Sequence, residues 1–141
     1  MGTLQKILNQ LRDEGLKITK YRIALLELFT KNKKPLTVAE ILSNLASNSL
    51  EPNKTTIYRE IDSLIELGHL QALDFGDDKK RYELSSREHH HHLICQKCDI
   101  IEDVVLKDDI QEIEKKVQGK SRFKIKSHSL EFFGLCLNCQ L

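Results

Sequence analysis

The sequence predicts an α+β protein: an N-terminal winged helix-turn-helix followed by a small α/β unit with a four-cysteine zinc site. Two observations support this fold class. Apolar residues recur at helical spacing through residues 1–67 and at alternate positions after Gly68, so helices give way to strands. Two CxxC pairs follow, in a chain of 141 residues that has room for two small domains.

Four helices are expected before Gly68, because apolar residues there repeat every three or four positions between turn residues. Gly15 ends the first helix, Thr19 caps the second, and Thr37 opens the third. The fourth covers KTTIYREIDSLIELG, with Gly68 as its C-terminal stop. Its expected buried stripe is Ile57, Ile61, Leu64 and Ile65.

After Gly68, alternating residues predict a β-hairpin of His69–Phe75 and Lys80–Leu84 around Gly76. The domains are therefore expected at residues 1–84 and 85–141. The second domain is predicted to contain strands His92–Cys95 and Ile100–Leu106, helix Asp108–Val117 and a long strand Arg122–Phe133.

Charge is distributed unevenly along a chain whose formal net charge is only +1. Residues 1–59 carry ten Lys or Arg against five acids, whereas residues 60–84 carry three against seven. A basic front half on a neutral chain favours a polyanion as partner. No apolar run approaches the roughly 18 residues of a membrane span, and the N-terminus lacks the apolar core of a signal peptide. We therefore expect a cytoplasmic protein with no membrane partner.

The buried stripe of the fourth helix leaves its first turns facing outward, as in a recognition helix that enters the major groove of DNA. A solvated helix face is the alternative interpretation. The hairpin after the helix and the cations Lys17, Lys20 and Arg22 before it favour DNA binding. The outward residues are Thr55, Thr56, Tyr58, Arg59 and Asp62.

Two CxxC pairs supply four thiolates, the full tetrahedral shell of a structural Zn²⁺. Cys95 and Cys98 form one pair, and Cys136 and Cys139 form the other. A thioredoxin-like redox pair is the alternative, but it requires a CxxC that opens a helix, and neither pair precedes an obvious helical pattern.

Four consecutive histidines run into the strand that bears the first cysteine pair. In an extended chain, alternate side chains share a face, so His90 and His92 point one way while His89 and His91 point the other. Two faces with two imidazoles each can serve two metal sites. Imidazole and carboxylate together suit Fe(II), Mn(II), Co(II) or Zn(II) without choosing among them. The nearby donors are Glu83, Glu102, Asp103 and His128.

Taken together, these motifs resemble the ferric uptake regulator (Fur) family of metal-responsive bacterial repressors. The segments that carry the resemblance span nearly the whole chain in the order that the family has. They are GLKITKYR (15–22), TTIYREIDSLIELG (55–68), RYEL (81–84), HHHHLICQKC (89–98) and HSLEFFGLCLNC (128–139).

The resemblance implies a homodimeric repressor of metal uptake or homeostasis genes, with two winged helices on a palindromic operator and a C-terminal dimerisation domain. Its implied cofactors are a structural Zn²⁺ on the four cysteines and a regulatory Fe²⁺, Mn²⁺ or Zn²⁺. Lys17, Tyr58 and Arg59 match the DNA contacts of the family. The regulatory site maps onto Glu83, His90, His92 and Asp103, and a second metal site maps onto His89, His91, Gln111 and His128.

The chain departs from the family pattern at three positions. Leu36 stands where the regulatory site usually has a histidine, and Gln111 stands where the second site has a carboxylate, with Glu112 or Asp109 as substitutes. Asp99 replaces a glycine, which Asp tolerates because it enters left-handed turns at modest cost.

Several alternative functions remain open at this stage. Within the family, the alternatives are a peroxide-sensing or zinc-sensing repressor. Outside it, they are a thiol redox protein or a zinc-storage protein. We do not expect an enzyme, because no nucleophile–base pair or phosphate-binding loop is recognisable.

Overall fold

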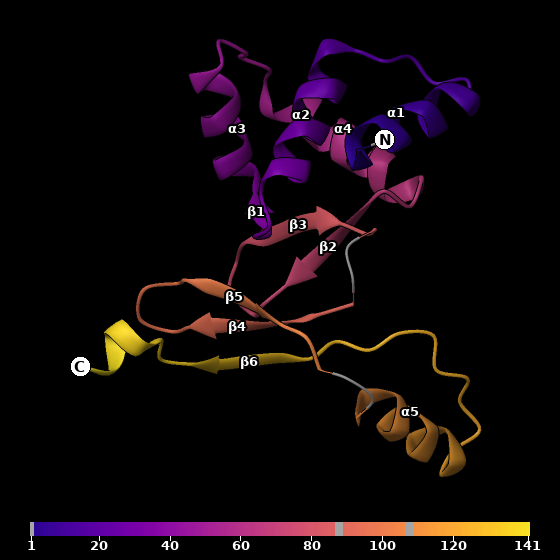
Figure 1. Ribbon diagram of the computed structural model, residues 1–141, viewed down its shortest axis with the longest axis vertical. Helices are drawn as coiled ribbons and strands as arrows, with labels where there is room; N and C mark the ends of the chain where they lie inside the picture. The colour runs from indigo at the N-terminus through magenta and orange to yellow at the C-terminus, as the bar shows by residue number, and fades with distance from the viewer. Residues whose placement is uncertain (1, 87–88, 107–108) are drawn as a thin grey trace. The chain divides into compact units, whose positions relative to one another are not determined.

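Three of the four N-terminal helices begin after a residue whose side chain caps the first turn. Thr19 accepts a hydrogen bond from the Arg22 amide at 3.1 Å, and Asn53 accepts one from the Thr56 amide at 2.8 Å. Thr37 forms a capping box with Glu40. The computed structural model describes residues 2–86, 89–106 and 109–141. Its first four helices are α1 (Thr3–Asp13), α2 (Lys20–Lys31), α3 (Val38–Ser47) and α4 (Lys54–Glu66) (Figure 1).

Gly68 ends α4, as the sequence predicted. Its φ of +82° lies in the left-handed region, which a residue without a Cβ adopts at little cost. The Gly68 amide donates to the Ile65 carbonyl at 3.0 Å, and the His69 amide donates to the Leu64 carbonyl at 2.8 Å. These two bonds form a Schellman motif, which turns the chain from α4 into the following hairpin.

The hairpin belongs to a three-stranded antiparallel sheet. It consists of β2 (Leu70–Asp74) and β3 (Lys80–Leu84), and β3 also pairs with β1 (Leu36–Thr37), in the order β1-β3-β2. The sequence analysis missed β1, because two residues are too few to show a period of two. Helices followed by this sheet form the predicted winged helix-turn-helix.

One apolar core lies among these helices and the sheet. The predicted stripe of α4 is buried as expected at Ile57, Ile61 and Leu64, with Ile65 partly buried against the core. The other helices contribute residues at the predicted spacing. Among them are Ile7, Leu8, Leu11, Leu26, Phe29, Ile41 and Leu45.

A second sheet forms in the C-terminal part, with the order β5-β4-β6. β4 (His91–Cys95) pairs antiparallel with β5 (Ile101–Val104) and parallel with β6 (Glu131–Gly134). A parallel pair needs a long crossover, and α5 (Asp109–Gly119) lies within it. A short 3₁₀ helix, η1 (Leu137–Gln140), ends the chain. The chain divides into two compact units, Met1–Arg87 and Glu88–Leu141. The division expected from the sequence lay three residues earlier, between 84 and 85.

The predicted long strand Arg122–Phe133 is wrong over most of its length, because only Glu131–Gly134 forms a strand. Its alternating pattern is real, but among the described residues no strand lies beside the earlier part to accept its backbone hydrogen bonds. The amides of Phe123 and Ile125 donate instead to the side chains of Ser121 and Gln118. The predicted first residue of the helix, Asp108, lies outside the described residues.

Candidate metal centres and nucleic-acid interface

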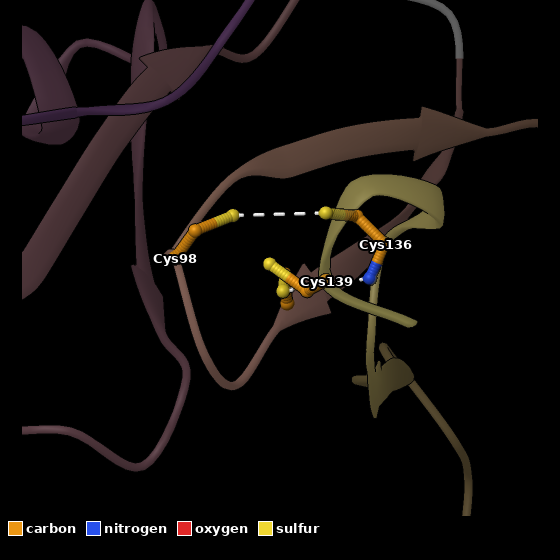
Figure 2. A group of neighbouring side chains, drawn as sticks. Cys98, Cys136 and Cys139 are labelled. Carbon is orange, nitrogen blue, oxygen red and sulfur yellow. Dashed lines mark hydrogen bonds between the residues drawn. The ribbon is translucent and has the colours of Figure 1, made fainter. Parts of the chain in front are cut away.

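The four cysteines converge at one end of the second sheet. Cys95 ends β4, Cys98 lies in the turn toward β5, Cys136 follows β6, and Cys139 lies in η1 (Figure 2). Their sulfur atoms all lie within 4.8 Å of one another, and the Cys98 and Cys136 sulfurs are 3.7 Å apart. Four thiolates around a tetrahedral Zn²⁺ would have sulfur–sulfur distances of about 3.8 Å. The donor set and its spacing therefore fit a structural zinc ion.

The turn between Cys95 and Cys98 depends on a left-handed residue. Asp99 has a φ of +61°, and its amide donates to the Cys95 carbonyl at 3.0 Å. An aspartate therefore adopts the conformation for which the family pattern has a glycine. The substitution leaves the approach of the two sulfurs intact.

The cysteines compete for protons when no cation is bound. Backbone amides, first that of Cys136, lower the pKa of Cys95 to about 6. The Cys136 side chain, a hydrogen-bond partner of Cys139, and burial raise the pKa of Cys139 to about 12. Four thiolates this close together repel one another, and a bound divalent cation would offset that negative charge in place of the protons.

Three histidines form a second group in the same unit. Donor nitrogens of His89, His91 and His128 lie within 4.8 Å of one another, and the ring centroids of His89 and His91 are 4.9 Å apart. Burial lowers the pKa of His91, and its neighbours His89 and His128 lower it further. Neutral imidazoles are the form that coordinates metal.

The carboxylate nearest this group was not predicted. Oε1 of Glu114, on α5, lies 2.5 Å from Nδ1 of His128. Gln111 lines the same cavity one helical turn earlier, whereas Glu112 is not among its lining residues. The suggested substitute Asp109 lies at the edge of the described residues, and its side chain is not among those described. The family pattern maps the helix ligand onto Gln111, and the carboxylate that contacts His128 lies one turn later on the same helix. The i, i+3 spacing puts Gln111 and Glu114 on one face of the helix, but only the tertiary contact shows which of them meets His128.

His90 and His92 group with Asp103 on the other side of β4. His92 and Asp103 are directly opposite each other in the β4–β5 register. The Nε2 atoms of His92 and His90 lie 3.6 and 4.0 Å from Oδ1 of Asp103. Two imidazoles and a carboxylate around one point can hold a divalent cation.

The other expected regulatory ligand, Glu83, belongs to the first unit. It lies on β3, where its Oε1 accepts a hydrogen bond from Nε2 of Gln71 at 2.9 Å. Leu36, at the position of the missing histidine, is buried in the core and pairs with Tyr82. An apolar side chain there supplies no ligand.

The first turns of α4 present the predicted polar face. Tyr58 is 43% exposed although it is aromatic, and Arg59 and Thr55 are exposed while Thr56 is half-buried. Lys17 is exposed in the loop before α2. The exposed side chains can meet a ligand from solvent, whereas the Thr56 hydroxyl donates to Oδ1 of Asn53 at 3.0 Å.

Arg22, one of the cations expected to favour DNA binding, is largely buried and forms an ion pair within the first unit. Its side chain is 10% exposed, and its Nε donates to Oε2 of Glu60 on α4 at 2.8 Å. Its Nη1 donates to the Lys17 carbonyl, also at 2.8 Å. The guanidinium therefore makes its hydrogen bonds within the first unit, and these bonds hold the loop of Lys17 against α4.

The sequence profile described as "Ferric uptake regulator family" matches residues 13–133, which is most of the chain. The chain belongs to the ferric uptake regulator family. A "Ferric uptake regulation protein" of Neisseria gonorrhoeae is 32% identical over 132 residues, which are 93% of this chain and 91% of that protein. A "Peroxide-responsive repressor PerR" of Staphylococcus saprophyticus is 29% identical over 137 residues, which are 97% and 91% of the two chains.

A solved Fur structure shares the whole fold. The Helicobacter pylori ferric uptake regulator, described as having three functional metal-binding sites, superimposes with a TM-score of 0.84 at 26% identity. The match covers 99% of this chain and 95% of that one.

Membership in the Fur family makes this chain a metal-responsive transcriptional regulator and not an enzyme. Its cofactors are divalent metal ions, in keeping with the cysteine and histidine groups described above. The cysteine pattern alone had left a thiol redox or zinc-storage protein open. In the part of the chain that the structure describes, no helix combines the length and apolarity needed to cross a bilayer.

Proposed function

We propose that this Fur-family chain is a metal-dependent, DNA-binding repressor of metal uptake or homeostasis genes. The exposed polar face at the start of α4 carries the proposal, because the opposite side of the helix is buried and a winged hairpin follows it. In this arrangement Tyr58 packs on thymine methyls in the major groove, and Arg59 binds a guanine edge or a phosphate. Thr55 and Thr56 add polar contacts, and Lys17 reaches the adjacent minor groove. Residues 1–84 are then the DNA-binding domain.

In this proposal the second unit holds a structural zinc and forms the dimer. Zinc on Cys95, Cys98, Cys136 and Cys139 holds together a unit of about fifty residues, which is too small to be stable on packing alone.

The partner for the second unit is a second copy of the chain. Strands β4 and β6 and the segment after β6 expose large apolar side chains, which line a cavity of about 370 Å³. Exposed apolar surface of this kind is typical of an interface. A two-fold dimer presents two recognition helices to a palindromic operator, because the symmetry of the protein matches that of the site. The exposed residues include Leu93, Phe132, Phe133, Leu135 and Leu137.

The regulatory metal binds His90, His92 and Asp103, with Glu83 as the ligand from the DNA-binding domain. The bound cation supplies positive charge that holds these donors together. The chain contributes two imidazoles from β4 and one carboxylate each from β5 and β3. Metal favours DNA binding only to the extent that it binds the DNA-competent conformation more tightly than the other conformations. Because Leu36 supplies no donor, a bound cation would need water or another ligand to complete its shell.

An anaerobic titration tests the proposal. The zinc-loaded protein is titrated with Fe(II), Mn(II), Zn(II), Co(II) or Ni(II) in the presence of labelled operator and scrambled DNA. We expect at least one metal to raise operator affinity about 5- to 150-fold, the usual range of coupling between two sites. Operator affinity that is equal with and without every metal would contradict metal dependence. Equal affinity for both DNAs would contradict operator recognition.

Peroxide sensing is a second candidate. Asp103 in place of a glutamate favours it slightly, whereas Leu36 in place of a histidine counts against it. In this case iron-loaded protein loses operator affinity on treatment with hydrogen peroxide, and a ligand histidine gains one oxygen by mass. Unchanged mass and affinity would exclude this branch in favour of metal sensing, for zinc or another ion.

A further inference from the structure

The group of His89, His91 and His128 includes a ring nitrogen that has no hydrogen-bond partner among the described residues. This nitrogen is Nε2 of His91, which is buried. His91 also forms a hydrogen bond with the backbone of Leu130, which must use its other ring nitrogen. A ring held by Nδ1 with a free, buried Nε2 is the usual presentation of a metal-ligating histidine. The residues therefore fit a divalent cation.

The helix that faces this group departs from the family pattern. Gln111 stands at the family's carboxylate position, and its neutral amide brings no charge to the site. Glu114 lies three residues later, so both side chains share one face of α5. Both line a cavity of about 180 Å³ together with His89 and His128. Compared with the family pattern, the carboxylate on this helix therefore lies one turn later in the sequence.

Glu114 contacts a histidine of the group. Its Oε1 lies 2.5 Å from Nδ1 of His128, and the two side chains are 32% and 26% exposed. Nδ1–H of His128 donating to a carboxylate leaves the lone pair on Nε2. The same bond makes the imidazole a stronger ligand.

We propose that Glu114 replaces the family's helix carboxylate and acts through His128, as the positioning residue of a three-histidine site for a borderline divalent cation such as Zn(II) or Co(II). The inference deepens the proposed function and rests on it. Three nitrogen ligands without a direct carboxylate disfavour Mn(II), which prefers oxygen. The site should therefore discriminate against Mn(II) more strongly than a family site that has the direct carboxylate.

Metal affinity of the full-length, zinc-loaded protein provides the test. His90→Ala and His92→Ala are introduced first, so that only the three-histidine group binds added Co(II) in competition with a chelator. In that background Glu114→Ala should weaken Co(II) binding about 10- to 100-fold, as loss of an outer carboxylate does. The matched control Gln111→Ala should stay within about threefold. Adding Gln111→Glu to Glu114→Ala should restore affinity, because the charge returns one turn earlier.

The nitrogen signals of His128 separate a positioning role from a general loss of structure. In the metal-free protein with neutral imidazoles, ¹⁵N NMR should find the His128 proton on Nδ1, and Glu114→Ala should move part of it to Nε2. Affinity or tautomer unchanged by Glu114→Ala overturns the inference. X-ray absorption provides a second check. If it detects an oxygen ligand that disappears in Glu114→Gln, the carboxylate binds the metal directly and the inference is also overturned. Operator binding is measured in parallel with unsubstituted protein. Its absence contradicts the proposed function, whereas failure of Co(II) binding alone contradicts only this inference.

Discussion

Nε of Arg22 on α2 donates to Oε2 of Glu60 on α4 at 2.8 Å, which joins the loop of Lys17 to the helix of Tyr58. Arg22→Ala should lower the free energy of unfolding by about 1.5–3 kcal/mol, because it leaves a largely buried carboxylate without its charged partner. Urea unfolding checks this. The exposed Arg12→Ala should change stability by less than about 0.5 kcal/mol. An Arg22→Ala protein with wild-type stability but a smaller salt dependence of DNA binding would restore Arg22 as a phosphate contact.

Tyr58→Ala should reduce sequence preference without loss of folding, since the ring is 43% exposed. Each lost base contact costs about 1–3 kcal/mol of discrimination. Competition between matched and scrambled operators measures it, and the melting temperature confirms the fold. An unchanged preference would contradict the recognition role of α4.

Lys17→Ala should weaken DNA binding. If the lysine neutralises one phosphate, the slope of log affinity against log salt should fall by about 0.9. If it lies in a narrow minor groove, preference for A·T there should fall as well. Lys6 is an exposed lysine on α1 and provides the control, since Lys6→Ala should alter neither the salt slope nor the base preference. A slope and base preference both equal to wild type would exclude Lys17 from the interface.

Cys95→Ser or Cys136→Ser should abolish zinc binding and destabilise the second unit, and dimerisation should be lost with it. Metal analysis, melting temperature and sedimentation measure the three effects together. The wild-type protein should hold one zinc per chain at this group, with no thiols that titrate before denaturation. A mutant that remains a dimer with an unchanged melting temperature would refute a structural role for zinc.

His90→Ala with His92→Ala should abolish metal-activated operator binding while the protein stays a zinc-loaded dimer. His89→Ala with His91→Ala should have a smaller effect, because those side chains belong to the other histidine group. Operator binding with and without metal compares the two proteins. The reverse ranking would locate sensing in the three-histidine group.

The hydrogen bond from Arg81 holds the pKa of Asp77 below its usual value of 3.8. A lowered folded-state pKa means that the stabilisation is present above the unfolded value and is lost as pH falls through the folded one. Carboxyl NMR should find that Asp77 titrates below 3.8, and Arg81→Gln should raise its pKa toward that value. Titration of Asp77 at 3.8 or above in the wild type would mean that the wing lacks this ion pair in solution.

Local patterns predicted most of the helices and the hairpin correctly. Helix caps and stops depend on backbone groups only a few residues away, so the local sequence predicts them. The caps at Thr19 and Thr37 and the stop at Gly68 are of this kind. The long strand from Arg122 failed for the opposite reason. Alternation records which side chains share a face, but a strand also needs a partner for its backbone.

The sequence by itself determined the four cysteines, the division of the histidines into two faces and the polar face of α4, because each depends on spacing within one segment. The tertiary structure decided which side chains meet across segments. Arg22 pairs with a glutamate 38 positions away, and Glu114 lies beside His128 across a loop. Spacing cannot rank Gln111, Glu112 and Glu114 as partners, since the path of the chain between α5 and His128 sets which helical turn faces the imidazole.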